Sequence, residues 1–182
     1  MAEIDPSDSS VRRRPLRLLH MSDLHISSDV YADEAFRGFE VGLKLGMENG
    51  ADVALIDIDM DGAKNTEQEI VGLGRKAAAY RANVSSAAEV EEAVDAVLSE
   101  FGRIDVLVNA AGVIGAPGWE DSPTAREVDW DITFDVNVKG TVIVSDVVSR
   151  HMKARRSGKI VNIASHGGRR GGANIGAYGA SK

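Results

Sequence analysis

Three polar residues in the last part of the sequence have the types and spacing of a proton-transfer site. Tyr178 and Lys182 are four positions apart, and Ser165 precedes the tyrosine by 13 positions. Residues four apart share one face of a helix. An ammonium group beside a phenol favours the phenolate, so Tyr178 could act as an acid or base near neutral pH. The Ser165 hydroxyl could hold a substrate oxygen. Any amphipathic helix can carry Tyr-x-x-x-Lys, so the hypothesis needs support from other elements.

Polar residues also stand at the ends of three apolar runs that are predicted to be strands. Asp57 follows residues 53–56, Asn109 follows residues 106–108, and Ser165 ends the run 160–165. Such runs without alternation are expected when both faces of a sheet are covered. Alternation of strands and helices with short links predicts a parallel sheet with right-handed crossovers. Ligands of such sheets bind beyond the carboxyl ends of the strands, so we expect these polar residues to gather at one edge.

The other elements follow from periodicity and helix-end signals. Residues 1–14 are interpreted as a disordered tail, and residues 15–182 as a single incomplete Rossmann-like domain whose segment 15–37 is atypical. Gly50, Gly74 and Gly102 stand where helices are expected to end. The predicted strands are 16–22, 53–56, 76–82, 104–108 and 159–164; the predicted helices contain Phe36 to Met47, 63–73, a capping box of Ser86 and Glu89 followed by residues to Phe101, and 123–156.

Residues 38–182 resemble the short-chain dehydrogenase/reductase family. The resemblance rests on Asn109-Ala110-Ala111-Gly112, on Phe-Asp-Val-Asn-Val-Lys-Gly at 134–140, and on the serine, tyrosine and lysine at the family's spacing. It implies an α/β fold, a partial Rossmann-type doubly wound parallel sheet in three αβα layers. It also implies a catalytic set in which Asn137 anchors a proton-relay water, Ser165 polarises a carbonyl, Tyr178 is the acid or base, and Lys182 tunes it and binds the nicotinamide ribose.

The function implied is an NAD-dependent oxidoreductase acting on a secondary alcohol or ketone. A carboxylate at the end of the second strand, Asp57, would bind the adenosine ribose and repel a 2′-phosphate, which favours NAD over NADP. Asn83 stands where the family usually has an aspartate near the adenine, and its amide oxygen could accept the same hydrogen bond. The implied cofactor-binding residues are Asp57, Asn83, Asn109, Ala110, Ala111, Gly112, Tyr178 and Lys182. Asp57 also opens a calcium-loop-like pattern, but Gln68 replaces the glutamate that such a loop needs.

The first fifty residues depart from the family. They lack the Thr-Gly-x-x-x-Gly-x-Gly turn that binds a pyrophosphate at a helix N-terminus. Residues 16–26 instead resemble the opening strand of a calcineurin-like metallophosphoesterase, with Asp23 and His25 at the positions of two metal ligands. The other elements of that family are absent from the sequence, so the segment is interpreted as an edge or replacement strand and no metal site is expected. A non-catalytic or chimeric fragment is the alternative function, and a metal-dependent phosphoesterase the least favoured.

Composition narrows the class of partner. The formal charge of −7 argues against nucleic acid and anionic membranes. No apolar run reaches the roughly 20 residues of a membrane span. The first residues are polar and acidic, so we expect no signal peptide. The absence of cysteine fits a cytoplasmic protein. We expect a small-molecule alcohol or ketone as partner, a homo-oligomer if the family fold were complete, and weak or no catalysis from the 182 residues as given.

Overall fold

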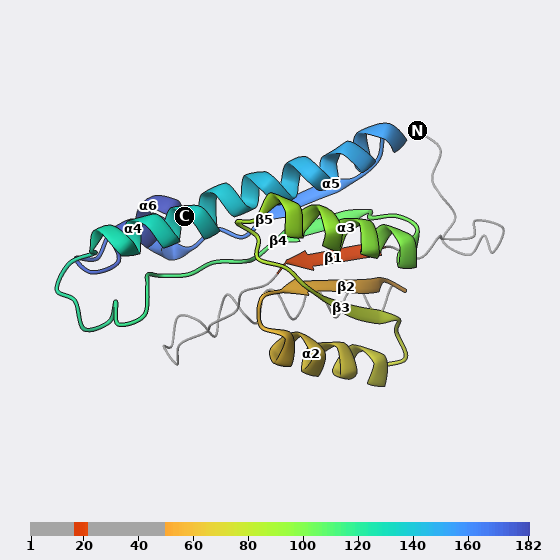
Figure 1. The fold of residues 1–182 in the computed structure, drawn as a ribbon, viewed down its shortest axis with the longest axis horizontal. Coiled ribbons are helices and arrows are strands. Elements are labelled where there is room, and N and C mark those ends of the chain that lie inside the picture. Colours follow the sequence, from red (N-terminus) through yellow and green to blue (C-terminus); the bar gives the residue numbers. More distant parts are fainter. Residues whose placement is uncertain (1–16, 22–49) are drawn as a thin grey trace, which may run out of the picture.

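The computed structural model describes residues 17–21 and 50–182. In them the chain forms one sheet with the strand order β3-β2-β1-β4-β5 (Figure 1), and all neighbouring strands run parallel. The order reverses at β1, as in doubly wound folds. The predicted fold class is therefore confirmed. The strands are β1 (Arg17–Met21), β2 (Asp52–Asp57), β3 (Ala77–Arg81), β4 (Val106–Asn109) and β5 (Lys159–Asn162).

The atypical N-terminal segment supplies the central strand of this sheet. Leu18 pairs with Val53 of β2 on one side and with Val106 of β4 on the other. The interpretation as a replacement strand is confirmed, and the alternative of an edge strand is wrong. Asp23, His25 and the helix predicted around Phe36 to Met47 lie outside the described residues.

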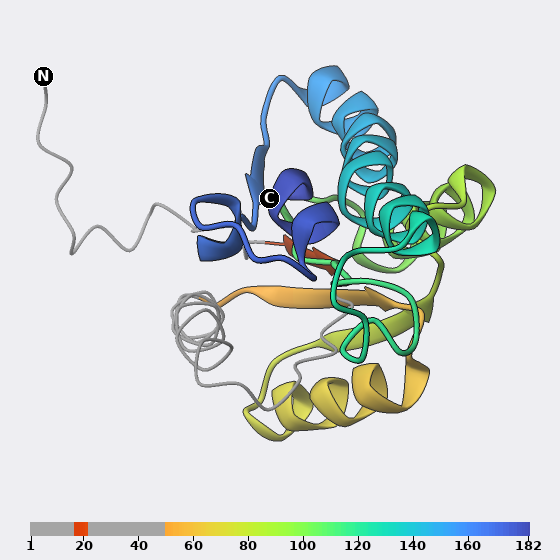
Figure 2. The ribbon, with the colours of Figure 1, turned by 90° about the vertical axis from the view of Figure 1, so that its left-hand side faces the viewer.

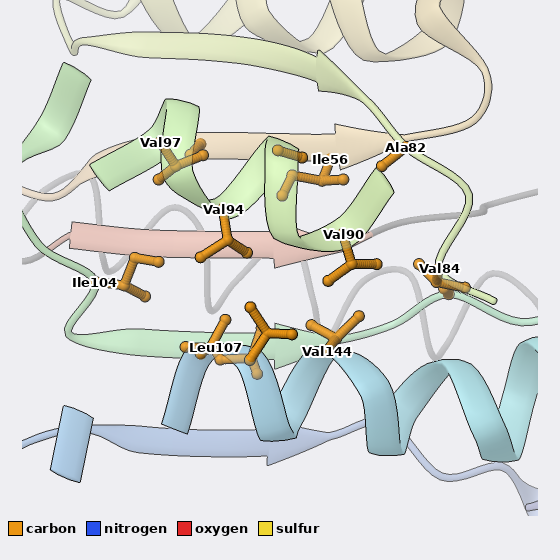
Figure 3. Close-up of a cluster of buried hydrophobic side chains, with 14 of the residues drawn as sticks. Ile56, Ala82, Val84, Val90, Val94, Val97, Ile104, Leu107 and Val144 are labelled. Atoms are coloured by element: carbon orange, nitrogen blue, oxygen red, sulfur yellow. The ribbon is translucent and has the colours of Figure 1, made fainter. Parts of the chain in front are cut away.

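Helices cover both faces of the sheet, which confirms the three layers. On β2, Val53 and Leu55 face α2 (Met60–Gly72), whereas Ala54 and Ile56 face α3 (Ala87–Phe101) and α5 (Thr141–Arg155). Figure 2 shows α2 on the side of the sheet opposite to α3 and α5. The larger core lies between the sheet, α3 and α5 (Figure 3) and includes Ile56, Val90, Val94, Val97, Ile104, Leu107 and Val144.

The helix ends agree with the sequence prediction at the C-termini of α2 and α3 but not at the N-terminus of α2. Gly74 and Gly102 have φ of +77° and +79°, as predicted for glycines at helix ends. However, α2 begins at Met60, three residues before the predicted start at position 63, because the Asp59 carboxylate accepts hydrogen bonds from the N–H groups of Asp61 and Gly62. Asp59 was not identified as an N-cap from the sequence.

The predicted capping box of α3 forms only in part. The Ser86 hydroxyl accepts a long hydrogen bond of 3.5 Å from the N–H of Glu89, as the pattern requires. The Glu89 carboxylate, however, accepts from the N–H of Asn83 at 3.0 Å. The glutamate therefore binds Asn83, near the beginning of the link between β3 and α3, rather than the backbone N–H of the N-cap residue Ser86.

The long helical region predicted at 123–156 has three parts. It begins four residues later than predicted, with α4 (Glu127–Thr133), passes through the π-helix η1 (Phe134–Gly140), and continues as α5. Single π turns inside α-helices are frequent at functional sites, and η1 contains Asn137. None of the helices in residues 50–182 combines the length and the apolar content needed to cross a bilayer.

An ion pair between the exposed Arg126 and the buried Asp129 fixes the loop that leads into α4. The Asp129 carboxylate accepts hydrogen bonds from the Arg126 guanidinium at 2.7 and 2.9 Å, from the Arg126 N–H at 2.8 Å and from the Ala116 N–H at 2.9 Å. Arg126 holds the pKa of the Asp129 carboxyl well below its usual range. All these bonds join the loop to the first turn of α4, so the pair determines where the helix begins.

A tyrosine on β3 gives the fold a measurable pH dependence. The Tyr80 hydroxyl donates to the Glu100 carboxylate at 2.7 Å. Burial and then this hydrogen bond raise the pKa of Tyr80, and the same bond lowers the pKa of Glu100. The lowered Glu100 pKa stabilises the fold above the unfolded value of about 4.3, and this stability is lost as the pH falls. The raised Tyr80 pKa stabilises it below about pH 10, and this stability is lost as the pH rises.

We therefore expect Tyr80→Phe to lower the free energy of unfolding near pH 7 by at most about 1 kcal/mol, because one hydrogen bond to an exposed carboxylate is lost. The difference from the unmodified chain should shrink as the pH falls below about 4.3, because the unfolded glutamate is protonated there first and the advantage of the lowered pKa of Glu100 is lost. Urea denaturation at several pH values measures this. The control is Glu92→Gln, because Glu92 is an exposed glutamate of α3, the helix that also contains Glu100. A difference that stays constant down to acidic pH would contradict the assignment.

Candidate active site

The carboxyl ends of β2, β4 and β5 bring polar side chains to one edge of the sheet, as expected. Asn109 at the end of β4 is paired in register with Asn162 at the end of β5. It is 6% exposed, and its amide group donates to Asn162 Oδ1 at 2.8 Å and to Ser145 Oγ at 2.9 Å. Asn109 thus ties two strands to α5. Its Oδ1 is a buried acceptor without a partner among the described residues.

Lys182 lies against the loop that follows Asn109. A Cβ atom added to Gly112 would stand 2.9 Å from Lys182 Nζ and 3.4 Å from Asn137 Oδ1. The absence of a side chain at position 112 therefore makes room for the ammonium group. Burial lowers the pKa of Lys182. Its Nζ also lies 5.8 Å from the centre of the Tyr178 ring. The structure thus brings together four of the predicted residues, Gly112, Asn137, Tyr178 and Lys182.

Ser165 and Tyr178 meet at another glycine. Ser165 caps the short helix η2 (His166–Gly168), and its Oγ accepts from the Gly167 N–H at 3.1 Å. That bond uses a lone pair and leaves the hydroxyl proton able to donate elsewhere. A Cβ on Gly167 would lie 3.0 Å from Tyr178 Cε1 and 3.5 Å from Ser165 Oγ. The phenol ring and the serine hydroxyl therefore lie on the same side of this glycine.

The helix that carries Tyr178, α6 (Gly176–Ser181), packs on η2 through a second glycine contact. A Cβ on Gly179 would lie 3.0 Å from the Gly167 carbonyl oxygen. Neither Gly167 nor Gly179 was identified from the sequence. The signal that could have found them is the glycine content of the loop between Ser165 and Tyr178, because small residues permit close backbone approach.

Asn137 is 5% exposed, and both N–H donors of its carboxamide are used inside the protein. Oδ1 accepts from the Val113 N–H at 2.8 Å, and Nδ2 donates to the Val113 carbonyl at 2.9 Å and to Ser181 Oγ at 2.8 Å. The side chain therefore braces the β4 loop against α6. Ser181 is a further residue of the site that was not predicted.

Asp57 and Asn83 lie on the β2–β3 half of the same edge. Asp57 is 7% exposed, and its Oδ1 accepts from the Asp59 N–H at 2.9 Å. Asn83 Oδ1 accepts from both the N–H and the hydroxyl of Ser85, at 3.0 and 2.8 Å. The acceptor positions of this amide oxygen are thus occupied, and the group left for a ligand is the Nδ2 donor. β1 separates Asp57 from the Lys182 side of the site.

Metal ligands do not cluster in the part of the chain that the structure describes. Residues 17–21 and 50–182 contain no group of three or more His, Asp or Glu side chains placed to hold an ion. In the calcium-like pattern, Asp59 serves as the N-cap of α2.

Comparison with known proteins identifies related sequences. The family model described as short chain dehydrogenase matches residues 38–182. A sorbitol dehydrogenase of Cereibacter sphaeroides is 40% identical over 138 residues, which cover 75% of this chain and 51% of that protein. A galactitol 2-dehydrogenase of Agrobacterium fabrum is 38% identical over 152 residues, which cover 81% of this chain and 56% of that protein. The chain spans about half the length of the curated relatives it matches.

Solved structures agree with this match. The NAD⁺-bound xylitol dehydrogenase superposes with a TM-score of 0.74 at 29% identity, covering 94% of this chain and 61% of that one. A gluconate 5-dehydrogenase from Burkholderia cenocepacia, in complex with NADP and tartrate, gives 0.69 at 30% identity, covering 92% and 60%. The matches lend no support to a metallophosphoesterase. The chain belongs to the short-chain dehydrogenase family.

Proposed function

We propose that this chain forms the nucleotide side of an oxidoreductase that interconverts a secondary alcohol and a ketone, with NAD(H) as the preferred cofactor. One observation carries the proposal: the Tyr178 ring lies beside Gly167 together with Ser165 Oγ, and its centre is 5.8 Å from Lys182 Nζ. A proton-accepting phenol, a cation and a hydroxyl donor are the groups that such a reaction needs at the substrate oxygen.

The residues at the sheet edge fit a nicotinamide dinucleotide. Ala110, Ala111 and Gly112 are small, so a flat ring and its ribose can approach the backbone, and Lys182 Nζ lies beside this surface. Asp57 and Lys182 would hold the two riboses, on either side of β1. When bound, the cofactor accepts or supplies the hydride.

In the oxidation direction, each residue would have a separate role. The Tyr178 phenolate takes the proton of the alcohol hydroxyl, and the Lys182 charge stabilises that phenolate. The Ser165 hydroxyl donates a hydrogen bond to the same substrate oxygen, which becomes the carbonyl oxygen. Asn137 holds α6 in place, because its side chain is hydrogen-bonded both to the backbone of Val113 and to Ser181. In the reverse direction Tyr178 returns the proton.

The preference for NAD(H) would depend on Asp57. Proteins similar to this chain have been solved with NAD and with NADP, so the family alone does not decide. A buried carboxylate at the end of β2 would bind ribose hydroxyls and repel a 2′-phosphate.

We expect Asp57→Ala to weaken NADH binding about ten- to a hundredfold, because a charged hydrogen bond contributes about 1.5–3 kcal/mol. It should tighten NADPH binding, because the repulsion of the 2′-phosphate is removed. Fluorescence titration with both cofactors measures the two Kd values in a chain whose residues 22–29 are replaced by a Thr-Gly-x-x-x-Gly-x-Gly segment, because the unmodified chain is expected to bind NADH weakly. Asp61→Ala, a nearby exposed acid in α2, should leave their ratio unchanged. Equal or tighter NADPH binding with Asp57 in place would overturn the NAD preference.

Polyols are the first substrates to test, since a sorbitol and a galactitol dehydrogenase are among the relatives. NADH formation with a panel of polyols, and NADH consumption with the matching ketoses, test the proposed activity. The alternative is a non-catalytic member of the family. It would bind the cofactor without turnover on any secondary alcohol or ketone.

A further inference from the structure

The helix that carries Tyr178 is short and has weak intrinsic stability. α6 contains six residues, of which two are glycines, and no side chain caps its first turn. Isolated helices of this length do not form in water, and glycine lowers helix propensity further. Contacts with the rest of the protein must therefore fix its position. Ala177, which is completely buried, anchors one side.

Ser181 makes the polar contact that fixes the other end of α6. Its Oγ accepts a hydrogen bond from Asn137 Nδ2 at 2.8 Å and donates one to the Tyr178 carbonyl oxygen at 2.8 Å. The hydroxyl therefore acts as acceptor toward Asn137 and as donor toward Tyr178. The hydroxyl joins the π-helix η1 to the backbone of Tyr178.

Asn137 is a rigid anchor for this hydroxyl. It is buried, and it is bonded twice to the backbone of Val113. Val113 follows Gly112, the residue against which Lys182 Nζ lies. Hydrogen bonds therefore connect the backbone of Val113, through the side chains of Asn137 and Ser181, to the backbone of Tyr178. Lys182 directly follows Ser181 in the sequence.

We propose that Ser181 is a positioning residue that sets the rotation of α6, and with it the approach of Lys182 to the Tyr178 hydroxyl. The role in turnover rests on the proposed function. Ser181 touches neither substrate nor cofactor in this assignment; it acts through the two residues that do. A displacement of about 1 Å in an active site can reduce a rate about a hundredfold, so the loss of this bridge should affect the chemical step.

Ser181→Ala is expected to reduce kcat about ten- to a hundredfold. It should change the KM for cofactor by a smaller factor than kcat, because Asp57, which would hold the other ribose, is unaffected. Ser181→Thr keeps the hydroxyl and should restore most of the rate. The matched control is Ser149→Ala on α5: Ser149 also donates to the carbonyl three residues earlier, at 3.1 Å, but has no second side-chain partner among the described residues.

A readout that does not need turnover separates this proposal from the proposed function. With isotope-labelled tyrosine, the Tyr178 ring signal can be followed by NMR at a fixed pH. Its chemical shift should change in Ser181→Ala, because the ring changes its position beside Gly167 and Lys182 Nζ, and should stay the same in Ser149→Ala and Ser181→Thr. An unchanged signal in Ser181→Ala overturns the positioning role. Absence of turnover in the unmodified chain, with the signal changed in Ser181→Ala, would instead reject the proposed activity alone.

Discussion

Tyr178→Phe is expected to lower kcat by roughly 10²–10⁴-fold, the usual contribution of a positioned acid or base. Phenylalanine lacks the hydroxyl that would exchange the proton. It keeps the ring that packs beside Gly167, so the fold and the cofactor affinity should change little. Steady-state rates with the best polyol, together with a thermal unfolding curve, measure both effects.

Tyr80→Phe removes the same atom elsewhere and is the matched control. The Tyr80 hydroxyl lies on β3, bonded to Glu100 of α3, so its loss should leave kcat within about twofold. If Tyr178→Phe kept more than about a tenth of the rate, another group would have to move the proton, and the assignment of Tyr178 would be wrong.

The sequence was most informative where structure depends on neighbouring residues. The apolar run at 53–56 predicted β2, because a strand covered on both faces has no polar positions. Gly74 and Gly102 predicted helix ends, because glycine readily adopts the positive φ found there. The gathering of Asp57 and Asn109 at one edge follows from the parallel order of the strands, so local patterns and topology together placed them correctly.

Contacts between distant segments could not be predicted in this way. The bond from Asn137 to Ser181 joins residues 44 positions apart, and the contact of Gly167 with Tyr178 depends on how η2 packs on α6. The π-helix could not be predicted either, because nothing in residues 134–140, where Phe134, Val136 and Val138 alternate with polar residues, indicates a π turn. The π turn accompanies two contacts with the loop after β4: Thr133 donates a hydrogen bond to the Ile114 carbonyl, and Asn137 donates one to the Val113 carbonyl.

Cofactor affinity should rise by two or more orders of magnitude when a glycine-rich turn is placed after β1. The structure makes this prediction specific, because β1 is the strand at which the strand order reverses. The dinucleotide crevice of doubly wound folds opens there, and the residues that follow the first strand bind the pyrophosphate. In this chain those residues are 22–37, which contain no glycine and carry Asp23, Asp29, Asp33 and Glu34 against a single arginine.

Such a sequence is chemically unsuited to a pyrophosphate. Backbone N–H groups reach the phosphates only where no side chain intervenes, and each hydrogen bond to a charged group contributes about 1.5–3 kcal/mol. The loss of two or three such bonds costs on the order of 3–9 kcal/mol, and each 1.4 kcal/mol is about tenfold in affinity. Carboxylates beside the phosphates would add repulsion. We therefore expect the unmodified chain to bind NADH with a Kd at or above about 1 mM.

The experiment replaces residues 22–29 by a Thr-Gly-x-x-x-Gly-x-Gly segment and measures the NADH Kd by calorimetry. A second replacement, identical except for alanine at each glycine position, is the control: it removes Asp23 and Asp29 equally but blocks the close backbone approach. Tightening with the glycine segment alone would assign the deficit to the missing N–H groups. Equal tightening with both segments would assign it to the carboxylates. Micromolar NADH binding by the unmodified chain would contradict the prediction, and would mean that residues other than a glycine turn bind the pyrophosphate in this protein.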